Sequence, residues 1–206
     1  DNINKEQNIN SICFDLHYND DIINICLDKA GKHNIYNAMA AIAIGREYGL
    51  DWNSIKKGLK KIEYSSLRMD IKNAAGISII NDTYNANPIS VKAAIDTLID
   101  MSEKRTIAVL GDMLELGSDE IEKHSEIGIY IVNKTIDLLI TVGKLAKYIA
   151  DSAENTEKML SDNIYSVMDN EDAALLLIEN IKKGDTVLIK GSRGMKMEEI
   201  VEKVIE

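Results

Sequence analysis

The sequence predicts an α/β protein: a mostly parallel β-sheet with helices on both faces, preceded by a β-hairpin and two helices. Two patterns lead to this fold class. From about residue 76 to the end, short apolar, β-branched runs alternate with longer stretches of helical period, as in parallel sheets covered on both faces. Residues 11–28 instead alternate apolar and polar side chains about a central turn, which indicates a hairpin. With 206 residues, 45% of them hydrophobic, the chain can bury a large core.

The register of the hairpin follows from its apolar side chains. A two-residue turn at Asn19-Asp20 puts them all on one face, pairing Ile12 with Leu27, Phe14 with Ile25 and Leu16 with Ile23. The same register sets Cys13 opposite Cys26. A cross-strand disulfide is one alternative there, but two cysteines make no disulfide framework, and we expect reduced thiols.

Two helices are expected after the hairpin. Gly31-Lys32-His33-Asn34 opens the first, over about residues 34–48, which has a face of small residues for close packing. The second, about 52–61, has apolar residues at helical spacing. Residues 62–70 then form a short connector that contains Arg68.

The remaining chain alternates strands and helices. The expected strands are Ile77–Asn81, Thr106–Leu110, Leu138–Val142, Ile164–Val167 and Thr186–Lys190. The expected helices follow Pro88 and cover about residues 119–133, 144–153, 171–181 and 194–205. In such sheets, ligands bind in the loops at the carboxyl ends of the strands.

Charge divides the chain in two. Residues 1–72 carry ten basic and ten acidic side chains, so the whole net charge of −10 falls on residues 73–206. We therefore expect one domain over 1–72 and another over 73–206. The acidic second part argues against sequence-independent nucleic-acid binding, which requires basic surfaces.

Three broader expectations follow from the composition. No window approaches the roughly 20 apolar residues that a membrane span needs, and no signal peptide is visible. The sequence starts at Asp1 without an initiator Met, so we expect a piece of a longer protein. The expected reduced thiols favour the cytoplasm. The three histidines and two cysteines lack zinc-ligand spacing, so no metal site is expected.

The familiar catalytic motifs are absent from the sequence. It has neither a G-x-x-x-x-G-K-[ST] phosphate loop nor G-x-G-x-x-G nor a G-x-S-x-G elbow. We therefore expect its chemistry to be shared with another part of a longer protein.

Four polar segments stand where ligands could bind. Asn37 lies one helical turn after His33 and Asn34, and amide and imidazole groups together can contact a purine or phosphate. The simpler alternative is N-capping of the helix by Asn34. After the strand ending at Asn81, the carboxylate of Asp82 can accept hydrogen bonds from ribose hydroxyls. The alternative there is a helix start, with Asn87 as the cap and Pro88 at the first helical position.

The other two segments follow later strands. Asp112 and Glu115 lie in a glycine-bounded loop and could contact a cation or an ammonium group, or simply be solvated. Lys190-Gly191-Ser192-Arg193-Gly194 joins the last strand to the last helix. Its basic side chains and the helix N-terminus suit a carboxylate or phosphate.

Together these segments resemble the Mur ligase family. Residues 31–41, G-x-H-N-x-x-N-x-x-A-A, are similar to a signature of its central ATPase domain, and Arg68-Met69-Asp70 to the arginine at the entry to its C-terminal domain. Residues 82–88, 109–117 and 188–198 resemble the branch that adds D-Ala-D-Ala. The resemblance runs from about residue 11 to the end. It departs at Leu67, where the family tends to have glycine before the arginine.

The resemblance implies a fold and an activity. Residues 73–206 would be the family's Rossmann-like C-terminal domain, and residues 1–72 the end of its central ATP-binding domain. The family forms an amide bond at the expense of ATP and Mg²⁺, through an acyl phosphate. Here the substrates would be UDP-N-acetylmuramoyl-tripeptide and D-Ala-D-Ala, in peptidoglycan precursor synthesis. The phosphate loop, magnesium-binding glutamate, modified lysine and UDP-sugar domain are missing, so we expect the chain to be inactive alone, and a monomer.

The resemblance also assigns residues to ligands. Residues on the ATP side would be His33, Asn34, Asn37, Arg68, Asp82, Tyr84, Asn85 and Asn87. The carboxylate of D-Ala-D-Ala would contact Lys190, Ser192 and Arg193. No residue of the chain is assigned to catalysis or to a metal. Two rival hypotheses remain: a stand-alone nucleotide- or ligand-binding α/β module, and another amide ligase of the Mur or folylpolyglutamate type.

Overall fold

The computed structural model describes residues 11–19, 21–28, 31–62 and 67–206, and the chain divides into two compact units, residues 1–64 and 65–206. This division lies earlier in the chain than the boundary at residue 72 that the charge distribution suggested. It does so because strand β3 (Asp70–Ala74) pairs with the sheet of the second unit.

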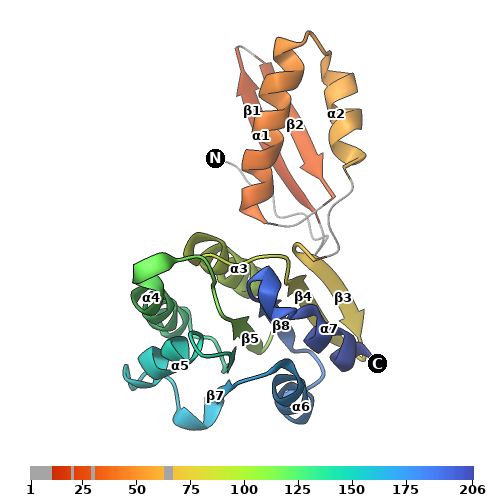
Figure 1. Ribbon diagram of the computed structural model, residues 1–206. Helices are drawn as coiled ribbons and strands as arrows, with labels where there is room; N and C mark the ends of the chain where they lie inside the picture. The colour runs from red at the N-terminus through yellow and green to blue at the C-terminus, as the bar shows by residue number, and fades with distance from the viewer. Residues whose placement is uncertain (1–10, 20, 29–30, 63–66) are drawn as a thin grey trace. The chain divides into compact units, whose positions relative to one another are not determined.

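The first unit is a hairpin covered by two helices. Strands β1 (Ile12–Tyr18) and β2 (Asp21–Leu27) are followed by α1 (Lys32–Glu47) and α2 (Trp52–Lys60) (Figure 1). The predicted register is confirmed: Phe14 lies opposite Ile25, and Leu16 opposite Ile23. The apolar side chains of this face pack against the two helices and form a small core of their own, with Ala38, Ile42, Ile55 and Leu59 from the helices.

The expectation of reduced thiols is wrong. Cys13 and Cys26 form a disulfide on the outer face of the hairpin, opposite to the core-facing side chains. The cause is the register itself, which brings the two Cα atoms to 4.1 Å. This is close to the separation of a non-hydrogen-bonded antiparallel pair, in which side chains approach each other most closely.

The second unit contains a six-stranded sheet in the order β3-β4-β8-β5-β6-β7. All pairings among β4 to β8 are parallel, and only β3 runs antiparallel, which confirms a mostly parallel sheet. After β3 the strands are β4 (Ile77–Asp82), β5 (Thr106–Gly111), β6 (Leu138–Val142), β7 (Ile164–Val167) and β8 (Thr186–Lys190). The helices are α3 (Pro88–Met101), α4 (Glu120–Asn133), α5 (Lys147–Glu154), α6 (Asn170–Asn180) and α7 (Glu198–Ile205), with short 3₁₀ turns at Gly117–Asp119, Ser161–Asn163 and Arg193–Met195.

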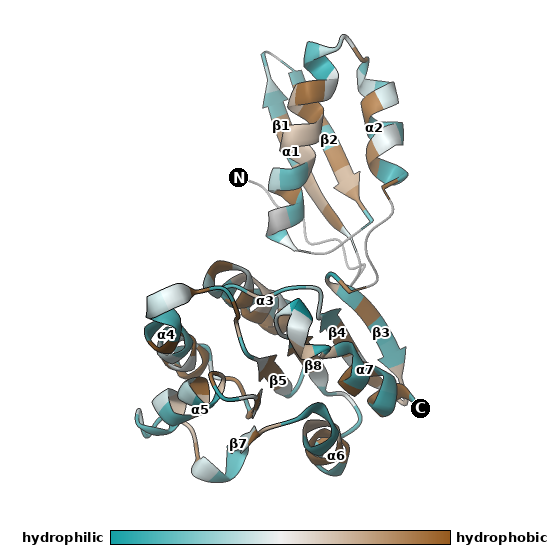
Figure 2. Cartoon of the chain, in the orientation of Figure 1, coloured by the Kyte–Doolittle hydropathy of each residue, from teal (hydrophilic) through white to brown (hydrophobic). Residues whose placement is uncertain are grey.

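Each face of this sheet has its own apolar core. Ile80, Ala108 and Leu188 point to the face covered by α3, α4 and α5, where α4 and α5 pack closely (Figure 1). Their strand neighbours Ile79 and Val187 point to the other face, under α6 and α7. The brown central strands in Figure 2 reflect this two-sided burial. Strands buried on both faces read as continuous apolar runs, which is why they could be predicted.

Two elements differ from the predicted ones. Strand β3 is not among the predicted elements: only its first residue lies in the expected connector 62–70, and the polar pattern of this edge strand does not indicate a strand. It turns into β4 through Ala75 and Gly76, both with positive φ (50° and 81°). The last helix was expected from residue 194. It begins at Glu198 instead, because Lys196 adopts a left-handed conformation (φ 49°) that interrupts the helical path.

Candidate functional site

The carboxyl ends of β4 and β8 carry two side chains predicted for different ligands. Asp82 and Lys190 are partners in the parallel ladder. Lys190 donates a hydrogen bond to Asp82 Oδ2 at 2.5 Å and a second one to the carbonyl of Asn85 at 2.8 Å. Lys190 is 2% exposed and Asp82 is 9% exposed. A buried charge is tolerated only when it is paired and hydrogen-bonded, and the two side chains meet this condition through each other.

The other oxygen of Asp82 holds the segment that leads into β3. Met69, buried and in a left-handed conformation (φ 49°), donates its backbone N–H to Asp82 Oδ1 at 3.1 Å. A second bond joins the same segments, from the Tyr84 N–H to the Leu67 carbonyl at 2.9 Å. The loop after β4 and the residues around Arg68 are thus fastened to each other at two points.

The side chains of Arg68 and Tyr84, which belong to these two connected segments, contact each other. The guanidinium carbon of Arg68 lies 4.0 Å from the centre of the Tyr84 ring. Both side chains are exposed. A stacked guanidinium and phenol present planar surfaces and a positive charge to solvent. Two residues assigned to ATP are therefore brought together, and Asp82 is hydrogen-bonded to Met69, the neighbour of Arg68.

Asn85 and Asn87 have local roles in the same loop. The side-chain oxygen of Asn85 accepts a hydrogen bond from the Ala86 N–H at 2.9 Å. Asn87 is the N-cap of α3: its side chain accepts from the Ser90 N–H at 2.8 Å, and Ser90 Oγ accepts from the Asn87 N–H. With Pro88 at the start of the helix, the alternative reading of this segment as a helix cap is confirmed.

Ser192 joins the loops that follow three strands. It is 3% exposed, its Oγ accepts from the Leu114 N–H at 2.8 Å, and it donates to the Ala86 carbonyl at 3.5 Å. Its own N–H donates to the Asp112 carbonyl. A small buried hydroxyl thus ties together the loops after β4, β5 and β8. Its hydrogen-bonding capacity is used within the protein.

Arg193, the third residue assigned to D-Ala-D-Ala, differs from its neighbours. Its side chain is 54% exposed, and its guanidinium pairs with Glu198 Oε1 at 2.8 Å. Glu198 Oε2 is buried and has no hydrogen-bond partner among the residues that the structure describes. The structure therefore separates the three predicted residues: Lys190 and Ser192 are buried within the loop network, and Arg193 faces solvent.

Asp112 is buried, at 8% exposure, and one of its carboxylate oxygens holds a neighbouring turn. Its Oδ1 accepts from the backbone N–H groups of Leu145 and Ala146, at 3.0 and 2.7 Å. This joins the loop after β5 to the turn after β6. Gly143 makes room for the carboxylate, since a Cβ at that position would lie 2.5 Å from Asp112 Oδ1. Glu115 is exposed at the outer end of the same loop.

His124, which the sequence analysis did not identify, supports the loop after β5. It is completely buried, its Nε2 accepts from the Met113 N–H at 2.9 Å, and its Nδ1 lies 2.6 Å from the Glu120 carbonyl. Both contacts are satisfied by a neutral ring that carries its proton on Nδ1. One signal was available, since His124 stands within the apolar spacing of α4, but a lone histidine at such a position does not reveal its partner.

Three predicted residues belong to the first unit. Helix α1 starts at Lys32 after Gly31, so Asn34 lies inside the helix and is not its cap. Asn34 is buried, at 6% exposure, and Asn37 is exposed. The side chain of His33 lies outside the described residues.

Among the described residues of the chain there is no group of three or more histidine, cysteine, aspartate or glutamate side chains placed to hold a metal ion. Within the same residues, every helix is too short or too polar to cross a membrane.

Comparison with known proteins places this geometry in a family. The profile described as Mur ligase, glutamate ligase domain, matches residues 67–193. The UDP-N-acetylmuramoyl-tripeptide–D-alanyl-D-alanine ligase of Bacillus subtilis (strain 168) is 44% identical over 179 residues, which cover 85% of this chain and 38% of the relative. The enzyme of the same name from Escherichia coli (strain K12) is 32% identical over 180 residues, or 87% of this chain and 38% of the relative.

Solved structures agree with the sequence relatives. A crystal structure of MurF from Acinetobacter baumannii superposes with a TM-score of 0.84 and 28% identity, over 96% of this chain and 43% of that one. MurF ligase from Thermotoga maritima, solved in complex with ADP, gives a TM-score of 0.78 and 25% identity, over 94% of this chain and 43% of that one. The chain thus spans about two fifths of the length of the relatives it matches.

Proposed function

This chain belongs to the Mur ligase family, and we propose that it is part of an ATP-dependent ligase that joins D-Ala-D-Ala to UDP-N-acetylmuramoyl-tripeptide in peptidoglycan precursor synthesis. The Bacillus subtilis and Escherichia coli relatives carry the name of that enzyme. The observation in this chain that carries the proposal is the exposed contact between Arg68 and Tyr84, next to the segment that Asp82 holds at the carboxyl edge of the parallel sheet.

The stack and the carboxylate suit a nucleoside. An aromatic ring and a guanidinium can contact the face of a base, and a carboxylate at a strand end can accept hydrogen bonds from ribose hydroxyls. Asp82 is held in place by the ammonium of Lys190 and by the Met69 N–H. We assign Arg68, Asp82, Tyr84 and Asn85 to ATP on this basis. Asn87 orients the loop by capping α3, and His33, Asn34 and Asn37 are assigned to ATP from the first unit.

The second substrate is assigned to the loop after β8. Arg193 and Lys196 are both exposed cations of that loop, and we propose that Arg193 binds the carboxylate of D-Ala-D-Ala. Lys190 and Ser192 support this site, because their hydrogen bonds hold the loops after β4 and β5 next to the loop after β8. In this assignment they position the dipeptide pocket, and Arg193 makes the direct ionic contact.

ATP supplies the phosphoryl group that makes the tripeptide carboxylate reactive toward an amine. From the resemblance to the family, we assign Mg²⁺ mainly to the part of the ligase that this chain does not match. The role of this chain is then to orient the nucleotide and the dipeptide and to exclude water from them. We further propose that the chain alone is inactive, that the ligase is a cytoplasmic monomer, and that residues before the second unit are the end of its ATP-binding domain.

A chimera tests the proposal. The segment of the Bacillus subtilis ligase that matches this chain is replaced by the chain itself. ADP release and product mass are then measured with UDP-N-acetylmuramoyl-tripeptide and D-Ala-D-Ala. We expect ligation of the dipeptide, dependent on both substrates, and none by the chain alone. The unmodified relative is the positive control. A chimera with the exposed Leu160 changed to Ser controls for the effects of mutagenesis and purification.

Other results would favour the rival hypotheses. Ligation of a single amino acid in place of the dipeptide would point to another amide ligase of the family. Tight nucleotide binding by the chain alone in calorimetry, together with a chimera that folds but never ligates, would favour a stand-alone binding module.

A further inference from the structure

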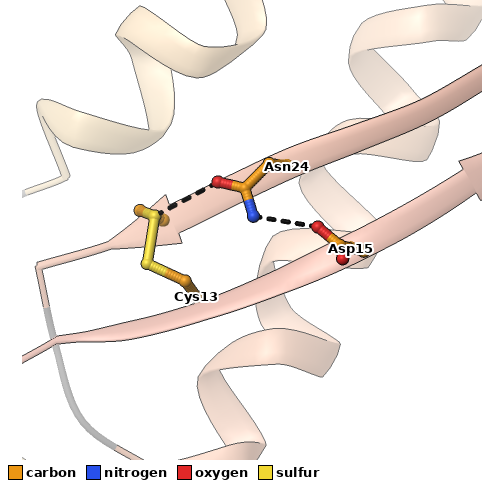
Figure 3. Close-up of a disulfide and its surroundings, with 4 residues drawn as sticks. Cys13, Asp15 and Asn24 are labelled. Carbon is orange, nitrogen blue, oxygen red and sulfur yellow. Dashed lines mark hydrogen bonds between the residues drawn. A yellow bond between two sulfur atoms is a disulfide. The ribbon is translucent and has the colours of Figure 1, made fainter. Parts of the chain in front are cut away.

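The outer face of the hairpin carries the disulfide in a polar and accessible setting. Cys13 and Cys26 are half-buried and lie away from the core formed with α1 and α2. Their neighbours on that face are Asp15 and Asn24, which are exposed and joined by a hydrogen bond of 2.9 Å (Figure 3). A dissolved thiol can therefore approach the sulfur atoms without entering the core.

The hairpin also has a place for the reduced cysteine. Asn24 Oδ1 lies 3.5 Å from Cys26 Sγ (Figure 3). A disulfide sulfur carries no proton, so this contact becomes a hydrogen bond only when Cys26 is a thiol that can donate to the amide oxygen. The same side chain keeps its second bond to Asp15 through its nitrogen. The surroundings of Cys26 are thus compatible both with the disulfide and with the reduced thiol.

The register of the hairpin does not depend on the disulfide. Seven residue pairs form the ladder, and core-facing pairs such as Phe14–Ile25 and Leu16–Ile23 hold it against the helices. The disulfide lies next to the last pair at the open end, Ile12–Leu27, far from the turn. Opening the bond should therefore loosen the strand ends and leave the core in place.

From these three observations we propose that Cys13 and Cys26 are a reversible thiol–disulfide exchange site for low-molecular-weight thiols. A thiolate RS⁻ attacks one sulfur, forms a mixed disulfide, and releases the other cysteine as a thiolate. A second RS⁻ attacks the mixed disulfide and releases RSSR. In sum, one protein disulfide and two RSH give two protein thiols and one RSSR. The site is independent of the ligase activity proposed above.

The test uses the full chain in its native state, in buffers with graded ratios of reduced to oxidised glutathione. Samples are quenched with acid, alkylated and weighed by intact mass spectrometry. We expect both thiols to appear together as the ratio rises and the disulfide to re-form when the ratio falls. In hydrogen exchange, the amides of Ile12 and Leu27 should exchange faster after reduction, while those of Leu16 and Ile23 stay protected.

Two variants separate this site from a merely structural disulfide. Asn24→Ala removes the acceptor for the reduced Cys26 and should shift the balance toward the disulfide by about twofold to fivefold. Asp15→Ala breaks the same Asn24–Asp15 bond but leaves the acceptor in place, so it should leave the balance near that of the parent chain.

Three outcomes would overturn the proposal. The thiols could become available only when urea unfolds the first unit, the cysteines could accept glutathione without ever bonding to each other, or reduction could unfold the core as well. Equal shifts in Asn24→Ala and Asp15→Ala would remove the assigned role of the Asn24 oxygen.

Discussion

Asp82 and Lys190 end two neighbouring parallel strands at the same level, and their side chains form a buried ion pair at 2.5 Å. The sequence assigned these residues to different substrates, the nucleotide and the dipeptide. Their direct contact links the two proposed sites through one interaction. A change at either residue should therefore affect both the proposed nucleotide site and the proposed dipeptide site.

The ion pair predicts a strong dependence of each side chain on the other. Lys190→Met leaves the Asp82 charge buried without its cation, and it should destabilise the second unit by about 3–5 kcal/mol. The double variant Asp82→Asn/Lys190→Met keeps an acceptor for the Met69 N–H and has no unpaired charge, so it should recover much of this loss. Urea denaturation followed by far-ultraviolet circular dichroism gives the free energies of unfolding. Purely additive single effects would contradict the interaction.

The Arg68–Tyr84 stack predicts a specific kinetic signature in the chimeric ligase. Arg68→Ala should raise the KM for ATP by about twofold to fivefold, as expected for an exposed cation–aromatic contact. Tyr84→Ala should have a similar effect, and the double variant should add little to either. Tyr84→Phe keeps the ring and is the matched control. If the KM for D-Ala-D-Ala rises instead while that for ATP is unchanged, the stack is assigned to the wrong substrate.

The parts of the fold that could be predicted are those that depend on local pattern. Strand β5 is buried at all six positions and its sequence is a run of apolar residues, so it could be recognised without its neighbours. Strand β3 was missed because it is an edge strand with polar residues, whose partner β4 is needed to define it. The hairpin register was predictable because one slip would expose all its apolar side chains.

The contacts of the candidate site could be predicted only in part. Asp82 and Lys190 were each identified at a strand end, but they are 108 residues apart and only the crossover order of the sheet makes β4 and β8 neighbours. The hydrogen bond from Ser192 to the Ala86 carbonyl likewise depends on the order of the strands in the sheet. The predicted register sets Cys13 opposite Cys26, but a register alone does not decide whether two facing thiols are oxidised, so the disulfide could not be predicted from it.

Gly143 and Gly117 predict a contrast between two glycines with positive φ. At Gly117 (φ 63°) a Cβ would meet nothing within 4 Å, so Gly117→Ala should cost about 1–2 kcal/mol, from backbone strain alone. At Gly143 (φ 109°) the Cβ would lie 2.5 Å from the Asp112 carboxylate, which holds the turn after β6.

Gly143→Ala should therefore cost about 3 kcal/mol or more, since it adds a steric clash and the loss of the Asp112 bonds to the strain. Thermal and urea unfolding of both variants give the comparison. Equal losses at the two positions would show that Asp112 can move away freely.

Lowering the pH should reduce the free energy of unfolding of the first unit, because it affects the N-cap of α2. Asp51 is the N-cap, and its carboxylate accepts from the Ser54 N–H at 2.8 Å and from Ser54 Oγ at 2.9 Å. These bonds, the backbone one first, lower the pKa of Asp51 below its ordinary value of 3.8. Because the folded pKa is the lower one, the charged cap stabilises the unit above pH 3.8, and this contribution is lost as the pH falls through the folded pKa.

The fluorescence of Trp52, the single tryptophan, reports the unfolding of this unit, since its ring packs edge-on against Tyr18 at 5.2 Å. The matched variant is Asp51→Asn, which retains a capping side chain but does not titrate. Between pH 5 and pH 2, the parent chain should lose more of its unfolding free energy than the variant does. The two should therefore approach each other in acid, because the parent loses the advantage of its charged cap. Parallel losses in both proteins would mean that other carboxylates dominate the acid response and that the Asp51 cap contributes no pH dependence.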